Sequence, residues 1–249
     1  MTLGLVAIVR NEAAVLPRLL ANVRGGIHWW TICDTGSTDG TQALILNALA
    51  GVPGELHERP WVSFGHNQTE MLRYARGKAD YLVHLGADET LDGAVRLDAL
   101  TEPSYALTIK DGGPLFATPR LFRSDLDWRY VGAAHAYLTA PQEPIPGRTL
   151  LDGLEVIHHG DGNRRRTGTR FEQTRALLER EYALEPTNPR TVYYLANTYR
   201  DLGRMDDALP LYWLRAALGG WQAEADNARE QAERIEAGDG RRVGVPSLT

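Results

Sequence analysis

The first part of the chain alternates between short apolar runs and segments in which apolar residues recur at helical spacing. The apolar runs end at Val9, Asp34 and Asp88, and the helical segments span residues 13–23, 41–50 and 67–76. Runs that are apolar throughout are typical of strands covered on both faces, which occur in parallel sheets. The alternation predicts an α/β domain in which helices connect parallel strands.

The pattern changes twice after residue 100. Residues 104–138 form short strand-like runs punctuated by Pro and Gly, as at the edge of a mixed sheet. A loop at 141–146 and a last short strand at 154–158 follow, and from Arg170 onward the spacing is helical throughout. We therefore expect a mixed α/β sheet with flanking helices, followed by an all-α segment.

The helical segment resembles a tetratricopeptide repeat over residues 189–217. The small and aromatic positions of such a repeat are filled by Leu195, Ala196, Tyr199, Gly203, Ala208 and Tyr212. An ordinary helical hairpin would explain these packing positions equally well. Because about three repeats are needed for independent stability, we expect these helices to pack on the N-terminal domain or to form a homodimer. The predicted parts are a domain over 1–165, a helical segment over 166–238 and a disordered tail over 239–249.

Two of the predicted strands end in a carboxylate. Ligands of open α/β sheets bind outside the carboxyl ends of the strands, so Asp34 is placed to accept hydrogen bonds from a ribose or a base. The following Ser37, Thr38 and Asp39 are helix-capping residue types, and we expect a helix to begin near Thr38.

Asp88 ends the second of these strands. Mg²⁺ and Mn²⁺ prefer oxygen ligands and take few of them from protein when substrate phosphates supply the rest. We expect a nucleotide at Asp34 and its metal-bound diphosphate at Asp88. The neighbouring Glu89 is interpreted as a solvated residue that opens the next turn.

Five segments of the chain together resemble the family-2 glycosyltransferases, which have the GT-A fold. They are residues 5–12, 34–41, 87–89, 120–135 and 157–160. The resemblance implies a GT-A-type, Rossmann-like mixed sheet and transfer of a hexose-like sugar from a nucleoside-diphosphate sugar with a divalent metal, Mn²⁺ or Mg²⁺. Inversion at the sugar is expected. The sugar, the base and the acceptor (a peptide, glycan, small molecule or modified nucleic acid) stay open.

The resemblance also implies donor-binding roles for residues at strand ends and helix starts. These residues are Val9, Arg10, Glu12, Asp34, Gly36, Asn67, Gln68 and Ala87. Arg10 is equally interpretable as a surface cation. Asn67 and Gln68 are expected to open a helix whose N–H groups favour a phosphate, and Gln68 stands where family members often carry an arginine.

The end of the last predicted strand adds a histidine and a basic cluster. The resemblance implies that His158 is a second ligand of the metal held by Asp88. Charge-assisted contacts from Arg164, Arg165 and Arg166 would suit a diphosphate, although such a cluster can also be a solvated charge run.

The chain departs from the family pattern at two chemically important positions. Gly86 replaces the first acid of the Asp-x-Asp metal motif, and Ala136 follows His135 where the family carries a glutamate that serves as base. An inverting transfer to a hydroxyl needs a general base within hydrogen-bond reach. His135 and Asp111 are the candidates, and a thiol acceptor would need the base less.

Composition sets outer limits on these interpretations. A formal net charge of −5 offers no electrostatic reason for nonspecific binding to nucleic acid or membranes. The single Cys33 agrees with a reducing compartment and is expected in the core, and the apolar start is too short for a signal or a membrane span. We expect a cytoplasmic glycosyltransferase. The alternatives are a noncatalytic sugar-nucleotide binder and a nucleotidyltransferase.

Overall fold

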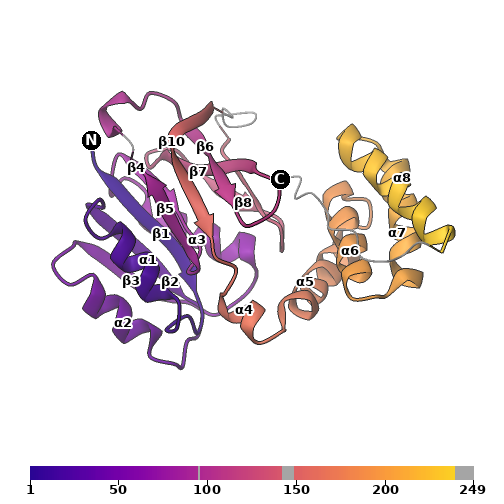
Figure 1. Ribbon diagram of the computed structural model, residues 1–249, viewed down its shortest axis with the longest axis horizontal. Coiled ribbons are helices and arrows are strands. Elements are labelled where there is room, and N and C mark those ends of the chain that lie inside the picture. Colours follow the sequence, from indigo (N-terminus) through magenta and orange to yellow (C-terminus); the bar gives the residue numbers. More distant parts are fainter. Residues whose placement is uncertain (95, 142–148, 239–249) are drawn as a thin grey trace. The chain divides into compact units, whose positions relative to one another are not determined.

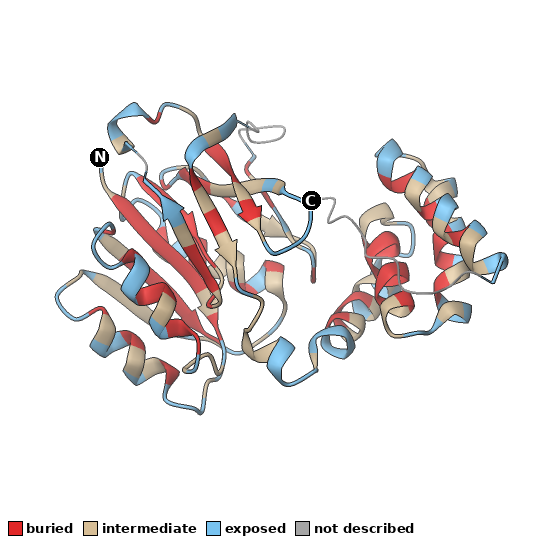
Figure 2. Cartoon of the chain, in the orientation of Figure 1, coloured by how far each residue is buried: buried red, intermediate tan, exposed pale blue. Residues whose placement is uncertain are grey.

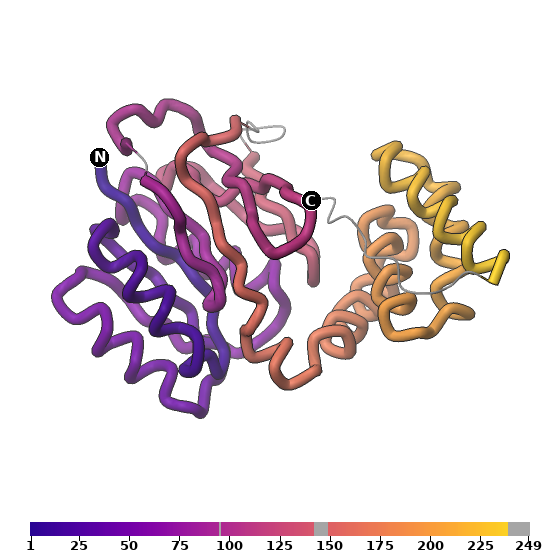
Figure 3. The backbone as a smooth tube through the Cα atoms, in the orientation of Figure 1, coloured from indigo at the N-terminus to yellow at the C-terminus, as the bar shows by residue number. Residues whose placement is uncertain are grey.

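The computed structural model describes residues 1–94, 96–141 and 149–238, which form two compact units. Of the described residues, the first unit comprises Met1–Val131 and Ala136–Arg166, and the second comprises Gly132–His135 and residues 167–238. Figure 3 traces the backbone through both units. The tail predicted over 239–249 lies outside the described residues, as does most of the loop predicted over 141–146.

An eight-stranded mixed sheet forms the centre of the first unit (Figure 1). Its strands are β1 (Leu3–Val9), β2 (Trp29–Asp34), β3 (Gly54–Glu58), β4 (Tyr81–His84), β5 (Glu89–Gly93), β6 (Ser104–Lys110), β7 (Phe116–Arg123) and β10 (Thr149–His158). They lie in the order β3-β2-β1-β4-β7-β6-β10-β5. Within this sheet, β7 and β5 run in the direction opposite to that of the other six strands. A separate hairpin joins β8 (Arg129–Val131) to β9 (Tyr137–Thr139).

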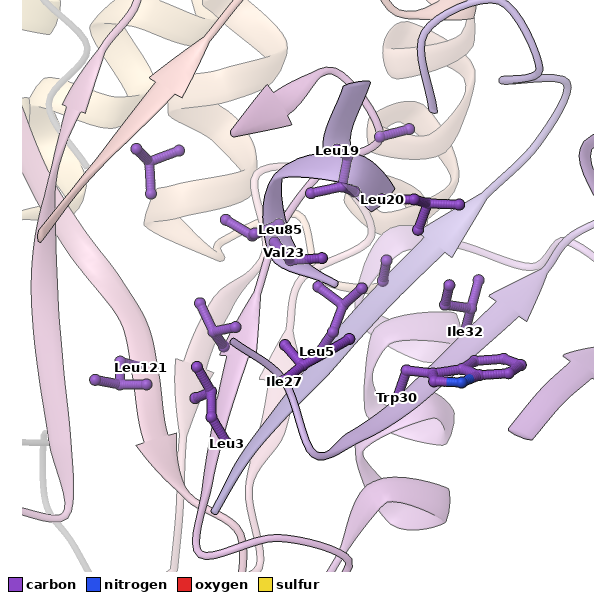
Figure 4. Close-up of a cluster of buried hydrophobic side chains, with 14 of the residues drawn as sticks. Leu3, Leu5, Leu19, Leu20, Val23, Ile27, Trp30, Ile32, Leu85 and Leu121 are labelled. Atoms are coloured by element: carbon purple, nitrogen blue, oxygen red, sulfur yellow. The ribbon is translucent and has the colours of Figure 1, made fainter. Parts of the chain in front are cut away.

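Helices cover both faces of this sheet because its central strands are apolar on both sides. One buried cluster contains residues of α1 (Leu16–Val23), with Leu44 and Ala48 of α2 (Thr41–Ala48) packed against it. The other cluster contains Met71, Leu72 and Ala75 of α3 (Phe64–Ala75). Figure 4 shows the first cluster around Leu5 and Leu19, and Figure 2 shows that the central strands are buried along their length.

Cys33 belongs to the second cluster and is fully buried, as the sequence predicted. Burial raises the pKa of its thiol to about 12. The side chain is therefore a small apolar residue of the core rather than a nucleophile.

Several element boundaries differ from those predicted. The first helix begins at Leu16 rather than residue 13, since Asn11 has a left-handed backbone (φ 56°) and the chain turns before it coils. The last strand of the sheet runs over Thr149–His158, longer than predicted, and the sequence pattern did not predict β5. A short 3₁₀ helix spans Leu97–Ala99.

The second unit consists mainly of four helices, as predicted from residue 170 onward. They are α5 (Arg170–Leu184), α6 (Pro189–Asp201), α7 (Met205–Leu218) and α8 (Gln222–Glu236). Tyr193, Tyr212 and Arg215 are buried among them. No described helix of either unit combines the length and the apolar character needed to span a bilayer.

Gly54 is a position where the sheet has no room for a side chain. It pairs with Trp30 on the neighbouring strand, and a Cβ built on Gly54 would lie 2.2 Å from the indole ring. Gly54→Ala must displace the buried ring of Trp30, so we expect it to lower the free energy of unfolding by about 1–3 kcal/mol in urea denaturation. Gly25→Ala is the control, because a Cβ there meets no atom within 4 Å. Equal effects of the two substitutions would contradict the packing.

Candidate functional site

The chain segments that carry the predicted site residues meet at one edge of the sheet. Strands β1, β2, β4, β6 and β10 run parallel, so their carboxyl ends lie along the same edge. In the register of β1 with β2, Val9 is directly opposite Asp34. The segments that follow Val9, Asp34, His84 and His158 therefore leave the sheet at this edge, which is where an open α/β sheet binds ligands.

Asp34 is fully buried at the end of β2, and its two carboxylate oxygens have different surroundings. Oδ1 accepts hydrogen bonds from the N–H groups of Gly36 (2.8 Å) and Ser37 (2.7 Å). The positive φ of Gly36 (104°) permits this tight turn. Oδ2 is buried and has no hydrogen-bond partner among the described residues. A buried carboxylate oxygen without a donor is costly, so this atom is suited to a donor from a ligand.

The helix after Asp34 begins at Thr41 and not near Thr38, so that prediction was wrong. Ser37 Oγ accepts from Asn11 N–H (2.8 Å), and Thr38 N–H donates to Asn11 Oδ1 (2.7 Å). Asp39 accepts from Ala13 N–H (3.1 Å) with one oxygen and from Thr41 N–H (3.1 Å), the first of α2, with the other. These contacts join the segment after β1 to the segment after β2.

The predicted residues of the first strand end have three different environments. Val9 is buried in the core, and its carbonyl accepts from both the N–H and the hydroxyl of Thr35. The side chain of Arg10 is exposed. Glu12 is half-buried, and its Oε2 accepts from Asn163 N–H at 2.9 Å. Only Glu12 of these three directs a carboxylate to the loop after β10.

That loop, residues 160–163, is tied to three groups of the first unit. Gly162 N–H donates to Asp88 Oδ2 (3.0 Å), and Asn163 N–H donates to Glu12. Asp161 forms two hydrogen bonds with Arg18 of α1, at 2.6 and 3.0 Å. A Cβ on Gly162 would lie only 3.0 Å from Asp88 Oδ2. The glycine therefore allows the backbone to approach the carboxylate closely.

The proximity of Glu12 to Asp88 affects its ionisation. Burial is the largest cause that raises the pKa of Glu12, to about 6, and the charges of Asp88 and Asp39 raise it further against the opposing effects of Asn163 and Arg166. Two acids from different strand ends thus lie close enough to interact. Such a pair favours a cation between or beside the two carboxylates.

Glu89 is not the solvated residue that the sequence suggested. Its side chain is only 6% exposed and forms an ion pair with Arg120 (2.9 Å), while Gly86 N–H donates to its other oxygen (2.6 Å). Burial alone raises the pKa of Glu89, but the contacts of Arg120, His158 and Gly86 together lower it to about 2. Glu89 is a buried anion, because Arg120 comes from the neighbouring part of the sheet and not from the local sequence.

His158 faces both acids of the 88–89 pair. Its Nδ1 lies 3.9 Å from Asp88 Oδ1 and 3.6 Å from Glu89 Oε1. Contact with Glu89 is the largest cause that raises the pKa of His158, and the charge of Asp88 acts in the same direction. No cluster of three or more metal-ligating side chains occurs among the described residues. Asp88 and His158 fit a Mg²⁺ or Mn²⁺ ion that takes its other ligands from water and phosphate.

The helix that was predicted to open at Asn67 begins earlier, at Phe64, with Ser63 as its N-cap. Asn67 lies one turn inside the helix and is fully buried, so the expectation that it opens the helix was wrong. Its amide accepts from the N–H groups of Val62 and Ser63 and donates to the carbonyl of Pro60. The side chain thus shapes the loop before α3.

Gln68 has a different environment from Asn67. Its side-chain oxygen is buried and has no hydrogen-bond partner among the described residues. An amide oxygen cannot supply the positive charge of the arginine found in the resembled family, so the chain has no cation at this position.

The three arginines after the last strand lie on the short helix α4 (Asn163–Arg166). The guanidinium of Arg164 stacks on the ring of Phe64 at 4.7 Å. Arg165 donates to the carbonyl of Gly160, and Arg166 donates to the carbonyls of Asp161 and Asn11. Arg165 and Arg166 are exposed, so the basic cluster borders the carboxylates from the solvent side of the loop.

The two candidate bases have different environments. Asp111 follows β6 at the same sheet edge but is exposed, and its carboxylate accepts from Gly113 N–H (3.0 Å). His135 belongs to the second unit, where its ring stacks on Tyr194 at 4.1 Å and its carbonyl accepts from Arg190. Ala87 is buried beside Asp88 and can contribute only its backbone.

Sequence reasoning missed three residues that shape this site. Arg120 lies inside a segment that resembles the family, so its position in the motif was a signal that could have been used. Gly162 follows a predicted strand end, where a glycine often marks close backbone approach. Arg18 lies on α1 and pairs with a residue far along the chain, so no local pattern indicates it.

Comparisons with known proteins agree with the geometry of the sheet. No family model matches the chain. Over 99% of this chain and 95% of the other, the structure resembles the crystal structure of S. aureus TarS residues 1–349 in complex with UDP-GlcNAc, with a TM-score of 0.52 and 13% sequence identity. The complex of the same fragment with UDP gives a TM-score of 0.50 at 13% identity.

A curated relative matches in sequence as well. It is a TPR repeat-containing protein of Synechococcus elongatus, 29% identical over 206 residues, which are 74% of this chain and 48% of the relative. The chain thus spans about half the length of this relative. At these identities the structural likeness concerns the fold. The predicted fold class, a GT-A-type mixed sheet followed by helices, is confirmed.

The raised pKa of Glu12 predicts a pH-dependent stability. Since the folded state binds this proton more tightly than the unfolded state, the free energy of unfolding should fall as the pH rises from about 4.5 to about 6. Glu12→Gln can still accept from Asn163 but cannot ionise. We expect the variant to gain about 1 kcal/mol relative to the native chain by pH 7, after allowance for solvent screening.

Urea denaturation between pH 4 and pH 7 measures this difference. Glu58→Gln, at an exposed carboxylate that ends β3, controls for the loss of a negative charge. A stability difference between Glu12→Gln and the native chain that is the same at every pH would contradict the shifted pKa.

Proposed function

We propose that this chain is a glycosyltransferase that moves a sugar from a nucleoside-diphosphate sugar to an acceptor with the help of a divalent metal. One observation carries the proposal: Glu12, Asp88 and His158 lie together at the carboxyl edge of a GT-A-type sheet, where the neighbouring strand β2 ends at Asp34. The TarS fragment, which has a similar fold, was crystallised with UDP-GlcNAc and with UDP. A UDP-sugar is therefore the donor to test first.

Asp34 is proposed to bind the nucleoside. Its Oδ2 is buried without a donor, while Oδ1 is held by the turn at Gly36 and Ser37. A ribose hydroxyl or a base N–H that reached this oxygen would satisfy it. A neutral amide at position 34 would lose the charge-assisted part of that hydrogen bond.

Asp88 and His158 are proposed to hold the metal, Mn²⁺ or Mg²⁺. A bound cation would stabilise the negative charge of the departing nucleoside diphosphate. In the ligand-free chain, Gly162 N–H occupies one oxygen of Asp88, and Glu12 is neutralised in part by a proton. A metal–diphosphate group would compensate the same negative charge more completely.

Arg164, Arg165 and Arg166 are proposed to contact the diphosphate. They follow directly on the loop that touches Asp88 and Glu12, and two of them donate to backbone carbonyls of the 160–163 loop. Guanidinium groups suit phosphate oxygens because they donate two parallel hydrogen bonds. A small movement of this short helix would exchange the carbonyl acceptors for phosphate oxygens.

Thermal-shift measurements with UDP, in the presence and absence of Mn²⁺, separate the contribution of the metal to UDP binding from that of the nucleoside. A ligand that binds only the folded chain raises its stability, by about 2.7 kcal/mol at a concentration 100 times Kd. We expect Mn²⁺ to increase the shift caused by UDP. Asp88→Asn should abolish this increase, whereas Asp34→Asn should reduce the shift with and without Mn²⁺.

Asp98→Asn, an exposed acid of the 97–99 turn, is the control and should behave as the native chain. A full Mn²⁺-dependent shift in Asp88→Asn would refute the metal assignment. Donor binding without sugar transfer to any of a broad panel of acceptors would favour the noncatalytic binder, for which Gly86 is the motivating departure. Pyrophosphate release from a nucleoside triphosphate would favour a nucleotidyltransferase.

Inversion is proposed, with His135 or Asp111 as the base that accepts the proton of the acceptor. General-base catalysis contributes about 10²- to 10⁴-fold, so the variant that removes the base should lose that factor in kcat with unchanged affinity for UDP. Measuring kcat and UDP affinity for His135→Gln and Asp111→Asn distinguishes the two residues. Full activity in both variants would remove them from the mechanism.

A further inference from the structure

Glu89 is a buried acid beside the proposed metal ligands that the mechanism above does not use. It is the direct cross-strand partner of His158 in the pairing of β5 with β10. Its Oε1 is 3.6 Å from His158 Nδ1, closer than the nearest oxygen of Asp88 at 3.9 Å. The carboxylate therefore lies against one specific nitrogen of the imidazole ring.

Two further contacts hold this carboxylate in place. Arg120 donates to Oε1 at 2.9 Å and Gly86 N–H donates to Oε2 at 2.6 Å. Arg120 also donates to the carbonyl of His84, which fixes the guanidinium on the sheet. Because removal of either member of a buried ion pair leaves an uncompensated charge, Glu89 has little freedom to turn toward solvent.

This arrangement favours one ring nitrogen of His158 over the other as the site of the proton. If Nδ1 lacked a proton, its lone pair would face the carboxylates of Glu89 and Asp88. With a proton on Nδ1, the same carboxylates attract it, and Nε2 keeps its lone pair. Nε2 lies toward the loop after β10, since a Cβ on Gly160 would be 3.8 Å from it.

We propose that Glu89 is the positioning residue of His158: it keeps the proton on Nδ1 and so presents the lone pair of Nε2 as the metal-binding atom. That the atom bound by Nε2 is a metal ion rests on the proposed function. The tautomer itself is a property of the ligand-free chain. A second carboxylate that orients a ligating histidine is worth about 10- to 100-fold in metal affinity.

Gly86 belongs to the same arrangement. A Cβ on Gly86 would lie 3.4 Å from Oδ1 of Asp88 and equally close to the carboxyl carbon and Oε2 of Glu89. The carboxylates of both acids thus border the space that a side chain at position 86 would enter.

Nitrogen-15 NMR of the imidazole ring tests the proposal without metal or substrate. The His158 signals are identified by their loss in His158→Gln, at a pH above the pKa of the ring. In the native chain we expect the proton mainly on Nδ1. In Glu89→Gln we expect that preference to weaken, since a neutral amide is a poorer acceptor.

Glu224→Gln is the matched control, because Glu224 is equally buried and paired with Arg215 in the second unit. It should leave the His158 spectrum unchanged. A proton mainly on Nε2 in the native chain overturns the proposal, and so does an unchanged spectrum in Glu89→Gln. The native spectrum decides by itself if Glu89→Gln does not fold.

Mn²⁺ binding in the presence of UDP gives the second readout. We expect Glu89→Ala to weaken it by 10- to 100-fold. Unaltered Mn²⁺ affinity in Glu89→Ala would refute the positioning role. Absence of Mn²⁺ binding in the native chain, together with a proton on Nδ1, would refute the proposed metal and leave the role of Glu89 on the ring intact.

Discussion

Negative charge gathered at one edge of the sheet is the constraint on which the rest of the site depends. Parallel strands bring Glu12, Asp34 and Asp88 to this edge, and like charges at close range disfavour one another. The ligand-free chain limits the cost in two ways. Backbone N–H groups of Gly162 and Asn163 donate to two of the carboxylates, and Glu12 holds its proton to a pKa of about 6.

The acids of this edge divide according to how their charge is compensated. Glu89 is buried with Arg120, and that ion pair satisfies it within the protein. Among the residues that the structure describes, Asp88 receives a backbone N–H and lies near an imidazole, and one oxygen of Asp34 has no hydrogen-bond donor. The charge of Glu89 is compensated inside the protein. Asp88 and Asp34 have carboxylate oxygens that can still accept hydrogen bonds from a ligand or bind a cation. The same physical criterion thus separates the proposed positioning residue from the proposed binding residues.

The sequence predicted those parts of the site in which residues act through local contacts. It did not predict the parts that depend on contacts between distant segments. The strand that ends at Asp34 was predicted because an apolar run followed by Asp is a local pattern. The strand predicted to end at Asp88 ends at His84, and Asp88 lies in the turn that follows. Asn67 was expected at the start of the helix, but its amide satisfies the loop that precedes the helix. Ser37 was misassigned because its hydroxyl accepts from the segment after β1, whereas Asp39 accepts both from that segment and from Thr41 at the start of α2.

The sequence by itself determined the alternation of strands and helices, the burial of Cys33 and the edge at which the acids gather. Each of these follows from hydrophobic periodicity and from the direction of consecutive strands. Only the tertiary structure decided that Glu89 is buried, that Arg18 and Arg120 compensate acids far along the chain, and that Gly162 touches Asp88. The physical reason is that compensation of a charge depends on which groups lie within a few ångströms in space, and strand order rather than sequence distance sets those neighbours.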